Sequence, residues 1–218
     1  MSGRFITFEG GEGVGKTTQL KQTADWLRAS GIESIVTREP GGTPQAEALR
    51  QILLTRDGET MPASAELLLM FAARALHLEN LVCPALDRGA WVLCDRFTDA
   101  TYAYQGGGRG METRDIDALV RVVHPRRQPD LTLLLDAPVE VGLGRALERS
   151  GSSGRDRFET EQRDFFERVR SAYLERARRE PQRIRVIDAS GDRTEVFKAI
   201  QQAVAPLLDR SKGIPEPG

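Results

Sequence analysis

The 218-residue chain has few cysteines, no marked excess of charge of either sign and no long hydrophobic run. Its two cysteines, Cys83 and Cys94, are too few for a disulfide framework or a structural zinc site. We therefore expect both cysteines to be small buried hydrophobic residues. The longest uninterrupted apolar run, residues 67–73, has seven residues, whereas a membrane helix needs about 20. We therefore expect a cytoplasmic chain with no membrane partner.

The charges are nearly balanced, with 31 Lys and Arg against 32 Asp and Glu. A protein that binds nucleic acid across its surface carries a broad cationic field, and this chain has none. We expect no nucleic-acid partner, and an anion would have to be held by a local group of residues. Hydrophobic residues make up 39% of the chain, which is enough for a folded core.

Short hydrophobic runs alternate with segments of helical periodicity. The runs predict strands at residues 5–8, 34–37, 90–94 and 131–135, with a weaker one at 184–187. Helices are expected at residues 16–30, 47–55, 65–81, 115–123, 139–149, 161–179 and 195–208, and Pro84 should kink or end the third. The runs at 90–94 and 131–135 are continuously apolar, as in strands buried on both faces of a parallel sheet. The pattern predicts one α/β domain, residues 1–210, with a doubly wound five-stranded parallel sheet, followed by a flexible tail at 211–218.

Residues 10–17 read GGEGVGKT and match the phosphate-loop pattern G-x-x-x-x-G-K-[ST] at every fixed position. The motif follows an expected strand and opens an expected helix, whose positive end would face the phosphates. Lys16 would add a point charge, and the Thr17 hydroxyl can take a Mg²⁺ position. A glycine-rich turn can match by chance, but the full motif in this context favours an ATP site. Its expected residues are Gly10, Gly11, Glu12, Gly13, Val14, Gly15, Lys16, Thr17 and Thr18.

The motif does not say what becomes of the γ-phosphate. A GTPase normally adds an Asn-Lys-x-Asp motif, which this chain lacks. A partition-type ATPase has a second lysine early in the loop, where this chain has Gly11 and Glu12. A phosphotransferase is then the leading class.

Asp95 and Arg96 follow an expected strand, at the sheet edge where open α/β folds bind ligands. The planar fork of arginine suits a phosphate, so Arg96 is a candidate clamp for a phosphorylated acceptor. Taken alone, such an arginine fits a simple surface ion pair equally well.

Three further segments favour the acceptor interpretation: TREPGGT at 37–43, LLLMFAAR at 67–74 and YQGGGRG at 104–110. Together with FEG at 8–10, the phosphate loop and Asp95-Arg96, they closely resemble bacterial thymidylate kinases. The resemblance runs from about residue 5 to residue 188, in the same order and at compatible spacing. It implies a P-loop kinase fold, a homodimer, and transfer of the γ-phosphoryl group of ATP to thymidine 5′-monophosphate (dTMP) with Mg²⁺.

The resemblance also implies roles for single residues in the acceptor site. Phe71 would stack on thymine, Arg74 would donate to its O4 atom, and Thr101 and Gln105 would face its N3–H edge. The other roles that it implies are Tyr104 beside the sugar 2′ position, Glu12 near the 3′-hydroxyl and the metal region, Arg38 and Arg96 on the phosphate, and Asp95 as an outer-sphere partner of the Mg²⁺.

Other interpretations of these residues stay open. Phe71 lies in an apolar stripe with Leu67, Leu68 and Met70, and on periodicity alone core packing is the commoner explanation. His77 and His124 show no partner pattern, and we expect them to be structural or solvent-facing. Phe97 and Ala100 stand where the family commonly has tyrosine and serine. These differences do not change the predicted reaction, but they bear on the finer contacts with the base and the sugar.

Residues 145–185 contain 12 arginines against 8 acidic residues. Part of this segment fits a solvated helix, because Arg163–Glu167 and Glu175–Arg179 are i,i+4 pairs. Residues 149–157 contain two glycines and three serines, and we expect a mobile loop at about 149–158 that corresponds to the family's lid over the triphosphate. Since the phosphate loop holds no arginine, the expected catalytic residues are Lys16, Arg96 and the lid arginines Arg149, Arg155 and Arg157.

Two other functions remain open at this point. The first is a kinase for a different nucleoside monophosphate, and the second is a non-catalytic or regulatory ATP-binding switch protein. The dependence of ADP release on the added monophosphate would distinguish both from a dTMP kinase.

Overall fold

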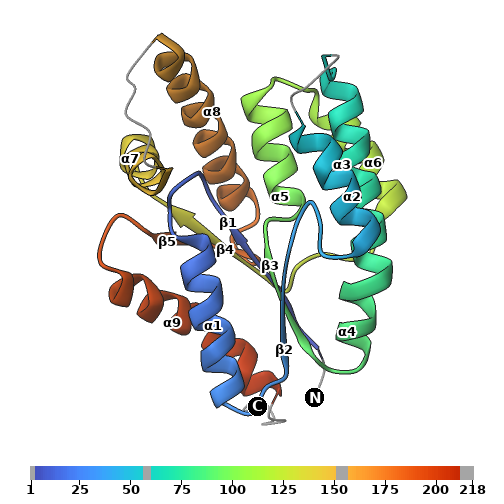
Figure 1. Ribbon diagram of the computed structural model, residues 1–218. Coiled ribbons are helices and arrows are strands. Elements are labelled where there is room, and N and C mark those ends of the chain that lie inside the picture. Colours follow the sequence, from blue (N-terminus) through green and yellow to red (C-terminus); the bar gives the residue numbers. More distant parts are fainter. Residues whose placement is uncertain (1–2, 56–59, 151–156, 212–218) are drawn as a thin grey trace.

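The computed structural model describes residues 3–55, 60–150 and 157–211 (Figure 1). Its centre is a five-stranded sheet in the order β2-β3-β1-β4-β5, and all four neighbouring pairs are parallel. The strands are β1 (Phe5–Glu9), β2 (Ser34–Arg38), β3 (Trp91–Asp95), β4 (Leu131–Asp136) and β5 (Ile184–Asp188). The predicted fold class is therefore confirmed.

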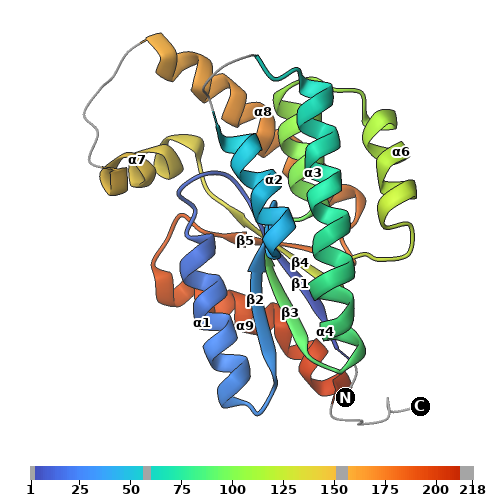
Figure 2. The same ribbon diagram turned by 45° about the vertical axis from the view of Figure 1, so that its right-hand side comes forward.

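Helices connect the strands and cover both faces of the sheet. They are α1 (Lys16–Ala29), α2 (Pro44–Leu54), α3 (Ala63–His77), α4 (Cys83–Asp87), α5 (Thr98–Thr101), α6 (Thr113–Val123), α7 (Val139–Ser150), α8 (Arg157–Arg179) and α9 (Arg193–Ser211), with π-helical segments η1 (Leu78–Val82) and η2 (Tyr102–Gly108). Figure 2 shows α1 and α9 on one side of the sheet and α3 and α4 on the other.

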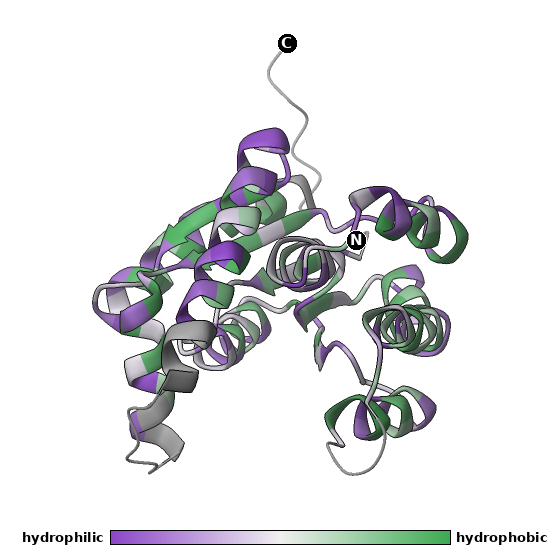
Figure 3. Ribbon diagram, turned by 90° about the horizontal axis from the view of Figure 1, so that it is seen from above, coloured by the Kyte–Doolittle hydropathy of each residue, from purple (hydrophilic) through white to green (hydrophobic). Residues whose placement is uncertain are grey.

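Alternating side chains of the central strands build the core on both faces. In β3, Trp91 and Leu93 pack in the cluster that includes Leu20 of α1 and Ile200 of α9. Val92 and Cys94 of the same strand belong to the cluster on the opposite face, with η1 and α4. Figure 3 shows the central strands coloured mainly as hydrophobic, as expected when both faces are covered.

The YQGGG segment, expected as a loop, is helical. It forms η2, which continues α5 and packs against α8. A Cβ atom on Gly107 would lie 2.5 Å from the Ala172 Cβ, and one on Gly108 would lie 2.5 Å from the Phe165 ring. The glycines are thus explained by the close approach of α8.

Pro84 was expected to kink or end its helix, and it does not end it. The helical chain runs from Ala63 to Asp87, and the π-helical segment η1 lies directly before the proline. There Cys83 N donates to Leu78 O, five residues back. This wider turn accommodates the proline ring, which would clash with the preceding turn of a regular α-helix. It also accommodates the missing N–H donor of the proline.

The same stretch, Ala63–Asp87, is long and apolar enough to meet a length and composition criterion for a membrane-spanning helix. Core helices meet that criterion as well. Its buried residues include Arg74 and His77, which bond to Glu39. These contacts are those of a helix packed into a domain.

Candidate active site

The phosphate loop connects the end of β1 to the start of α1. Gly13 and Gly15 have φ angles of 69° and 90°, in the left-handed region that favours glycine. The Lys16 ammonium donates to Gly10 O at 3.1 Å and to Gly11 O at 2.6 Å, which holds the side chain across the loop. The expected arrangement of strand, loop and helix is present.

Burial and the nearby Arg96 guanidinium lower the pKa of Lys16 to about 8, although Asp95 and Glu12 oppose the shift. The side chain is 8% exposed. A cation in such a desolvated position interacts strongly with an anion that enters beside it.

The loop faces a polar cavity of about 190 Å³ between the ends of β2 and β3. The walls of this cavity bring together most of the predicted phosphate-handling residues, which are Lys16, Thr17, Thr18, Arg38, Asp95 and Arg96. The carboxyl ends of parallel strands meet at one edge of the sheet, which explains why residues distant in sequence meet here.

Arg50 of α2 lines the same cavity, and the sequence analysis missed it. Its Nη1 atom donates to Pro40 O at 2.9 Å. No local pattern distinguishes Arg50 from other arginines on exposed helices. Arg38, by contrast, is about half exposed and forms two hydrogen bonds to the Glu47 carboxylate, at 3.0 and 2.9 Å.

Arg96 links the phosphate loop to η2. Its φ angle is 69°, and its N–H donates to Phe8 O at 3.0 Å, which fixes this unusual backbone conformation. Its Nη2 atom donates to the Glu12 carboxylate at 2.5 Å and to the Tyr104 hydroxyl at 2.8 Å. Burial opposes the charge, but Tyr104, Tyr173 and Glu12 together raise the pKa of Arg96, so the guanidinium stays charged.

A second cavity, of about 310 Å³, lies beyond Arg96 between α2, α3 and η2. Predicted site residues that line it are Arg74, Arg96, Tyr104 and Gln105, and further lining residues include Glu39, Arg50, Met70, Phe97 and Arg109. The predicted acceptor residues are thus mostly in one place, adjacent to the polar cavity at the phosphate loop.

Arg74 is almost fully buried and is held by two partners. Its Nε atom donates to Glu39 Oε2 at 2.7 Å, and its Nη2 atom donates to the Thr101 hydroxyl at 3.0 Å. Burial alone would raise the pKa of Glu39, but Arg74 and His77 hold it below its usual value. Among the described residues, Arg74 Nη1 has no hydrogen-bond partner.

Gln105 shows the complementary pattern. Its Nε2 atom donates to Glu66 Oε1 at 2.7 Å, whereas its Oε1 atom is buried and has no partner within the described part of the chain. Arg74 and Gln105, which both line the cavity, therefore carry one buried donor and one buried acceptor that no described residue satisfies. Such groups are costly unless a ligand or water pairs with them.

Phe71 is not among the residues that line this cavity. It is 2% exposed, and its ring stacks on His124 at a centroid distance of 6.2 Å. It packs with Leu67 and Ile116 in the core, the alternative that the apolar stripe favoured, and its stacking on the base stays a prediction. Met70 and Phe97 line the cavity instead. Thr101 is also absent from the wall and lies behind Arg74.

The two histidines are structural, which is one of the two outcomes expected for them, and each is held by partners. His77 is fully buried and contacts Glu39 Oε1 at 2.9 Å and the Thr37 hydroxyl at 2.8 Å. His124 contacts the Thr98 hydroxyl at 2.9 Å. Their side-chain hydrogen-bond partners lie 26 to 40 residues away in sequence, and the local contact of His124 is to a backbone oxygen, of Arg127, so no local side-chain pattern marks them.

A third cavity, of about 360 Å³, lies on the other side of the phosphate loop. It is bounded by the loop, by α7 and by the segment between β5 and α9, with Arg145, Ala189, Gly191 and Arg193 among its lining residues. Arg145 donates to Ala189 O and Ser190 O at 2.8 and 2.9 Å. Apart from residues of the phosphate loop and Thr18, the sequence analysis named no residue here, because α7 and the β5–α9 segment carry no recognisable motif.

The lid prediction is corrected in part. The helix α7 extends to Ser150 and α8 begins at Arg157, so Arg149 and Arg157 lie at helix ends rather than within a loop. The acidic residues at α8 positions 159, 161 and 164 favour an early helix start, which the serines and glycines before them obscured. Arg155 lies outside the described residues, as do the side chains of Arg149 and Arg157.

The described residues contain no group of three or more His, Cys, Asp or Glu side chains that could hold a metal ion. A Mg²⁺ ion bound with a nucleotide does not require such a cage, because phosphates and water supply most of its ligands. Thr17 and Asp95 both line the polar cavity, and Asp95 Oδ1 is buried with no hydrogen-bond partner in the described structure. The predicted metal residues therefore fit such an ion.

A parallel α/β sheet with a phosphate loop that lies between two cavities is the arrangement of a P-loop nucleoside monophosphate kinase. The thymidylate kinase family model matches residues 8–200. The chain is 55% identical over 210 residues to the thymidylate kinase of Pseudomonas putida, covering 96% of this chain and 100% of that protein. It is 57% identical to that of Chromohalobacter salexigens, over 94% of this chain and 95% of that one.

A solved structure agrees with these relatives. The crystal structure of thymidylate kinase from Ehrlichia chaffeensis matches with a TM-score of 0.76 at 31% identity, covering 94% of this chain and 99% of that one. The chain belongs to the thymidylate kinase family.

Proposed function

We propose that the protein transfers the γ-phosphoryl group of ATP to dTMP, giving ADP and dTDP. The observation that carries the proposal is a pair of unsatisfied buried groups, Arg74 Nη1 and Gln105 Oε1, on two residues that line the acceptor cavity. The O4 atom of thymine is an acceptor and the adjacent N3–H is a donor, so one base edge pairs with both groups. Cytosine presents a donor and an acceptor in the opposite order, and it would leave both protein groups unpaired.

Met70 and Phe97 supply the apolar part of the acceptor cavity, and they take the place first expected for Phe71. Thr101 acts through Arg74, whose guanidinium it helps to orient. Tyr104 lies between the base-binding residues and Arg96, in a position suited to the deoxyribose. Glu12, which accepts hydrogen bonds from Arg96 and Tyr104, borders the same part of the site.

The polar cavity between the two nucleotide sites suits in-line phosphoryl transfer. The dTMP phosphate enters beside Arg96, Arg50 and Arg38, and the triphosphate lies along the phosphate loop beside Lys16. The acceptor phosphate is itself an adequate nucleophile, so the chain needs no strong general base and forms no covalent intermediate. Thr17 and Asp95 would hold a Mg²⁺ ion, which neutralises charge on the β- and γ-phosphates when bound.

The cavity between α7 and the β5–α9 segment is the proposed site for the adenosine of ATP. It opens directly from Gly13, Gly15 and Thr18 of the phosphate loop, so a triphosphate on the loop continues into it. Lid arginines, Arg149, Arg155 or Arg157, would complete the charge stabilisation around the transferred group. We also propose a homodimer: α3 and α6 pack together and expose Leu68 and Val122, at 58% and 78%, and light scattering would test the mass.

The proposed activity is tested by ADP release from ATP with a panel of nucleoside monophosphates. A dTMP kinase prefers dTMP to dUMP by about 10–200-fold, since the 5-methyl group contributes about 1–3 kcal/mol, and it rejects purine monophosphates. Preference for a different monophosphate would instead indicate another kinase of the class. ADP release that is independent of any monophosphate would indicate an ATP-binding switch protein.

A further inference from the structure

The phosphate loop touches α7 backbone to backbone. A Cβ atom on Gly142, in the second turn of α7, would lie 2.3 Å from Glu12 O, and a Cβ atom on Gly13 would lie 1.8 Å from Gly142 O. Both distances are under 3.0 Å, which real Cβ contacts essentially never show. The contact therefore requires glycine on both sides, and only one of the two glycines belongs to the phosphate-loop motif.

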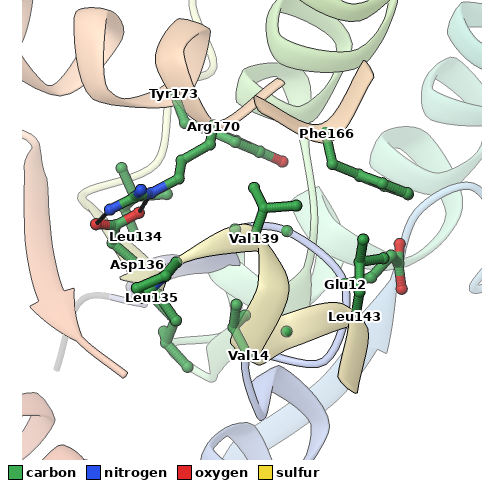
Figure 4. Close-up of a pocket in the computed structure, with 15 residues that line it drawn as sticks. Glu12, Val14, Leu134, Leu135, Asp136, Val139, Leu143, Phe166, Arg170 and Tyr173 are labelled. Atoms are coloured by element: carbon green, nitrogen blue, oxygen red, sulfur yellow. Dashed lines mark hydrogen bonds and ion pairs between the residues drawn. The ribbon is translucent and has the colours of Figure 1, made fainter. Parts of the chain in front are cut away.

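The surroundings leave little room for the loop to move away. Figure 4 shows Val139 and Leu143 of α7 around the same narrow space as Glu12 and Val14 of the loop. On the side of β4, a Cβ atom on Gly10 would lie 2.2 Å from Leu135 O, so the loop is confined from that direction as well.

The helix α7 is itself fixed at a second point. Arg145, three residues after Gly142, donates to the backbone oxygens of Ala189 and Ser190 in the segment that follows β5. The helix thus lies against the loop at one position and is bonded to the opposite wall of the proposed adenosine cavity at another. A shift of the contact at Gly142 would move the loop rather than the helix.

We propose that Gly142 is a positioning residue for ATP, which lets the α7 backbone lie directly on the phosphate loop and so sets where the loop N–H groups meet the triphosphate. The inference rests on the proposed function in one respect, that ATP is the phosphoryl donor. To reach 3.0 Å from a Cβ on residue 142, Glu12 O must move by about 0.7 Å, the difference from 2.3 Å. An ordinary hydrogen bond lengthened by that amount, to about 3.6 Å, is no longer one.

The chain offers a matched control on the same helix. Gly144 lies two residues further along α7, and a Cβ atom there would have nothing within 4 Å. Gly142→Ala and Gly144→Ala make the same chemical change in the same helix, and in both cases alanine favours the helix over glycine. They differ only in the contact with the phosphate loop.

The test compares the two variants with the unaltered protein by titration with Mg·ATP and separately with dTMP, together with the melting temperature. We expect Gly142→Ala to raise the Kd for ATP at least about 10-fold, to raise the Kd for dTMP by a clearly smaller factor through the contact of Glu12 with Arg96, and to keep a cooperative melting transition. Gly144→Ala should keep both affinities. In steady-state assays Gly142→Ala should raise KM for ATP more than KM for dTMP.

Two outcomes would overturn the proposal. The first is ATP affinity in Gly142→Ala within about twofold of the unaltered protein. The second is equal loss of ATP and dTMP binding with a lost melting transition, which would make Gly142 a residue of the general fold. Because the titration measures ATP binding and not turnover, a protein that binds ATP but phosphorylates a different acceptor would refute the proposed function alone.

Discussion

Arg74 Nε donates to Glu39 Oε2 across 2.7 Å, and the two side chains are 1% and 3% exposed. With Nη2 bonded to Thr101, the remaining guanidinium nitrogen, Nη1, is a buried donor without a partner among the described residues, and Arg74 lines the proposed base-binding cavity. Glu39, on the loop after β2, thus helps to determine which guanidinium nitrogen of Arg74 in α3 is left unpaired.

Removing Glu39 should therefore destabilise the protein strongly. Glu39→Ala leaves a buried arginine without its carboxylate, which costs about 3–5 kcal/mol. Urea unfolding measures the change, and Glu33→Ala is the control, because its exposed pair with Arg88 is expected to contribute less than about 1 kcal/mol. Similar losses in the two variants would contradict the account of the buried pair.

Arg96→Ala should weaken the acceptor site and spare the donor site. Loss of a partly desolvated charge contact with the dTMP phosphate costs about 2–5 kcal/mol, which would appear as a raised KM for dTMP. Titration with ATP should show little change, and Arg88→Ala, whose partner Glu33 is exposed, should leave both substrates unaffected. A fall in ATP affinity with unchanged dTMP affinity would show that Arg96 acts in the donor site and not in the acceptor site.

Glu9 should make stability depend on pH. The carboxyl is fully buried, and burial together with Asp99 raises its pKa from 4.5 to about 8. Between these values the folded protein keeps a proton that the unfolded chain has released, so this group's contribution to stability falls as pH rises. Unfolding free energies at about pH 6 and about pH 9 should therefore show a loss in the unaltered protein that is smaller in Glu9→Gln.

The control for that measurement is Glu33→Gln, because the Glu33 side chain is 64% exposed. Its unfolding free energy should follow the unaltered protein at every pH. Parallel curves for Glu9→Gln and the unaltered protein would show that Glu9 is not the group responsible.

Arg157→Ala should reduce turnover by roughly 10²–10³-fold, because an arginine that acts on the transition state can contribute that much and its neighbours supply part of the charge. Dissociation constants for ATP and dTMP should change far less. Arg179→Ala, at the other end of α8 and paired with Glu175, should be nearly silent. Normal turnover with weakened ATP binding would show that Arg157 contributes only to ATP binding, and that Arg149 or Arg155 stabilises the transition state.

The sequence was sufficient to predict where the strands lie along the chain, the class of the sheet and the phosphate loop, because these depend on local patterns of apolarity and glycine. It was not sufficient for side-chain direction within the LLLMFAAR helix. Met70 and Phe71 are neighbours and equally apolar, and only packing against His124 and Ile116 decides which of them leaves the cavity wall.

Arg50, Glu39 and Gly142 were missed for a related reason. Each matters through a partner that is distant in sequence or belongs to the backbone, and such partners leave no local signature. The glycines of η2 carried a signal that was misread, since glycine marks a close approach between helices as well as a turn.

The central place of β1 in the sheet has a kinetic consequence. The donor cavity lies over the side of β4 and β5, and the acceptor cavity lies over the side of β2 and β3, with the phosphate loop between them. Each nucleotide can therefore enter and leave without passing through the other's site. Double-reciprocal plots of rate against one nucleotide at several fixed concentrations of the other should intersect rather than run parallel, as for a ternary complex in which both substrates are bound before the phosphoryl group moves.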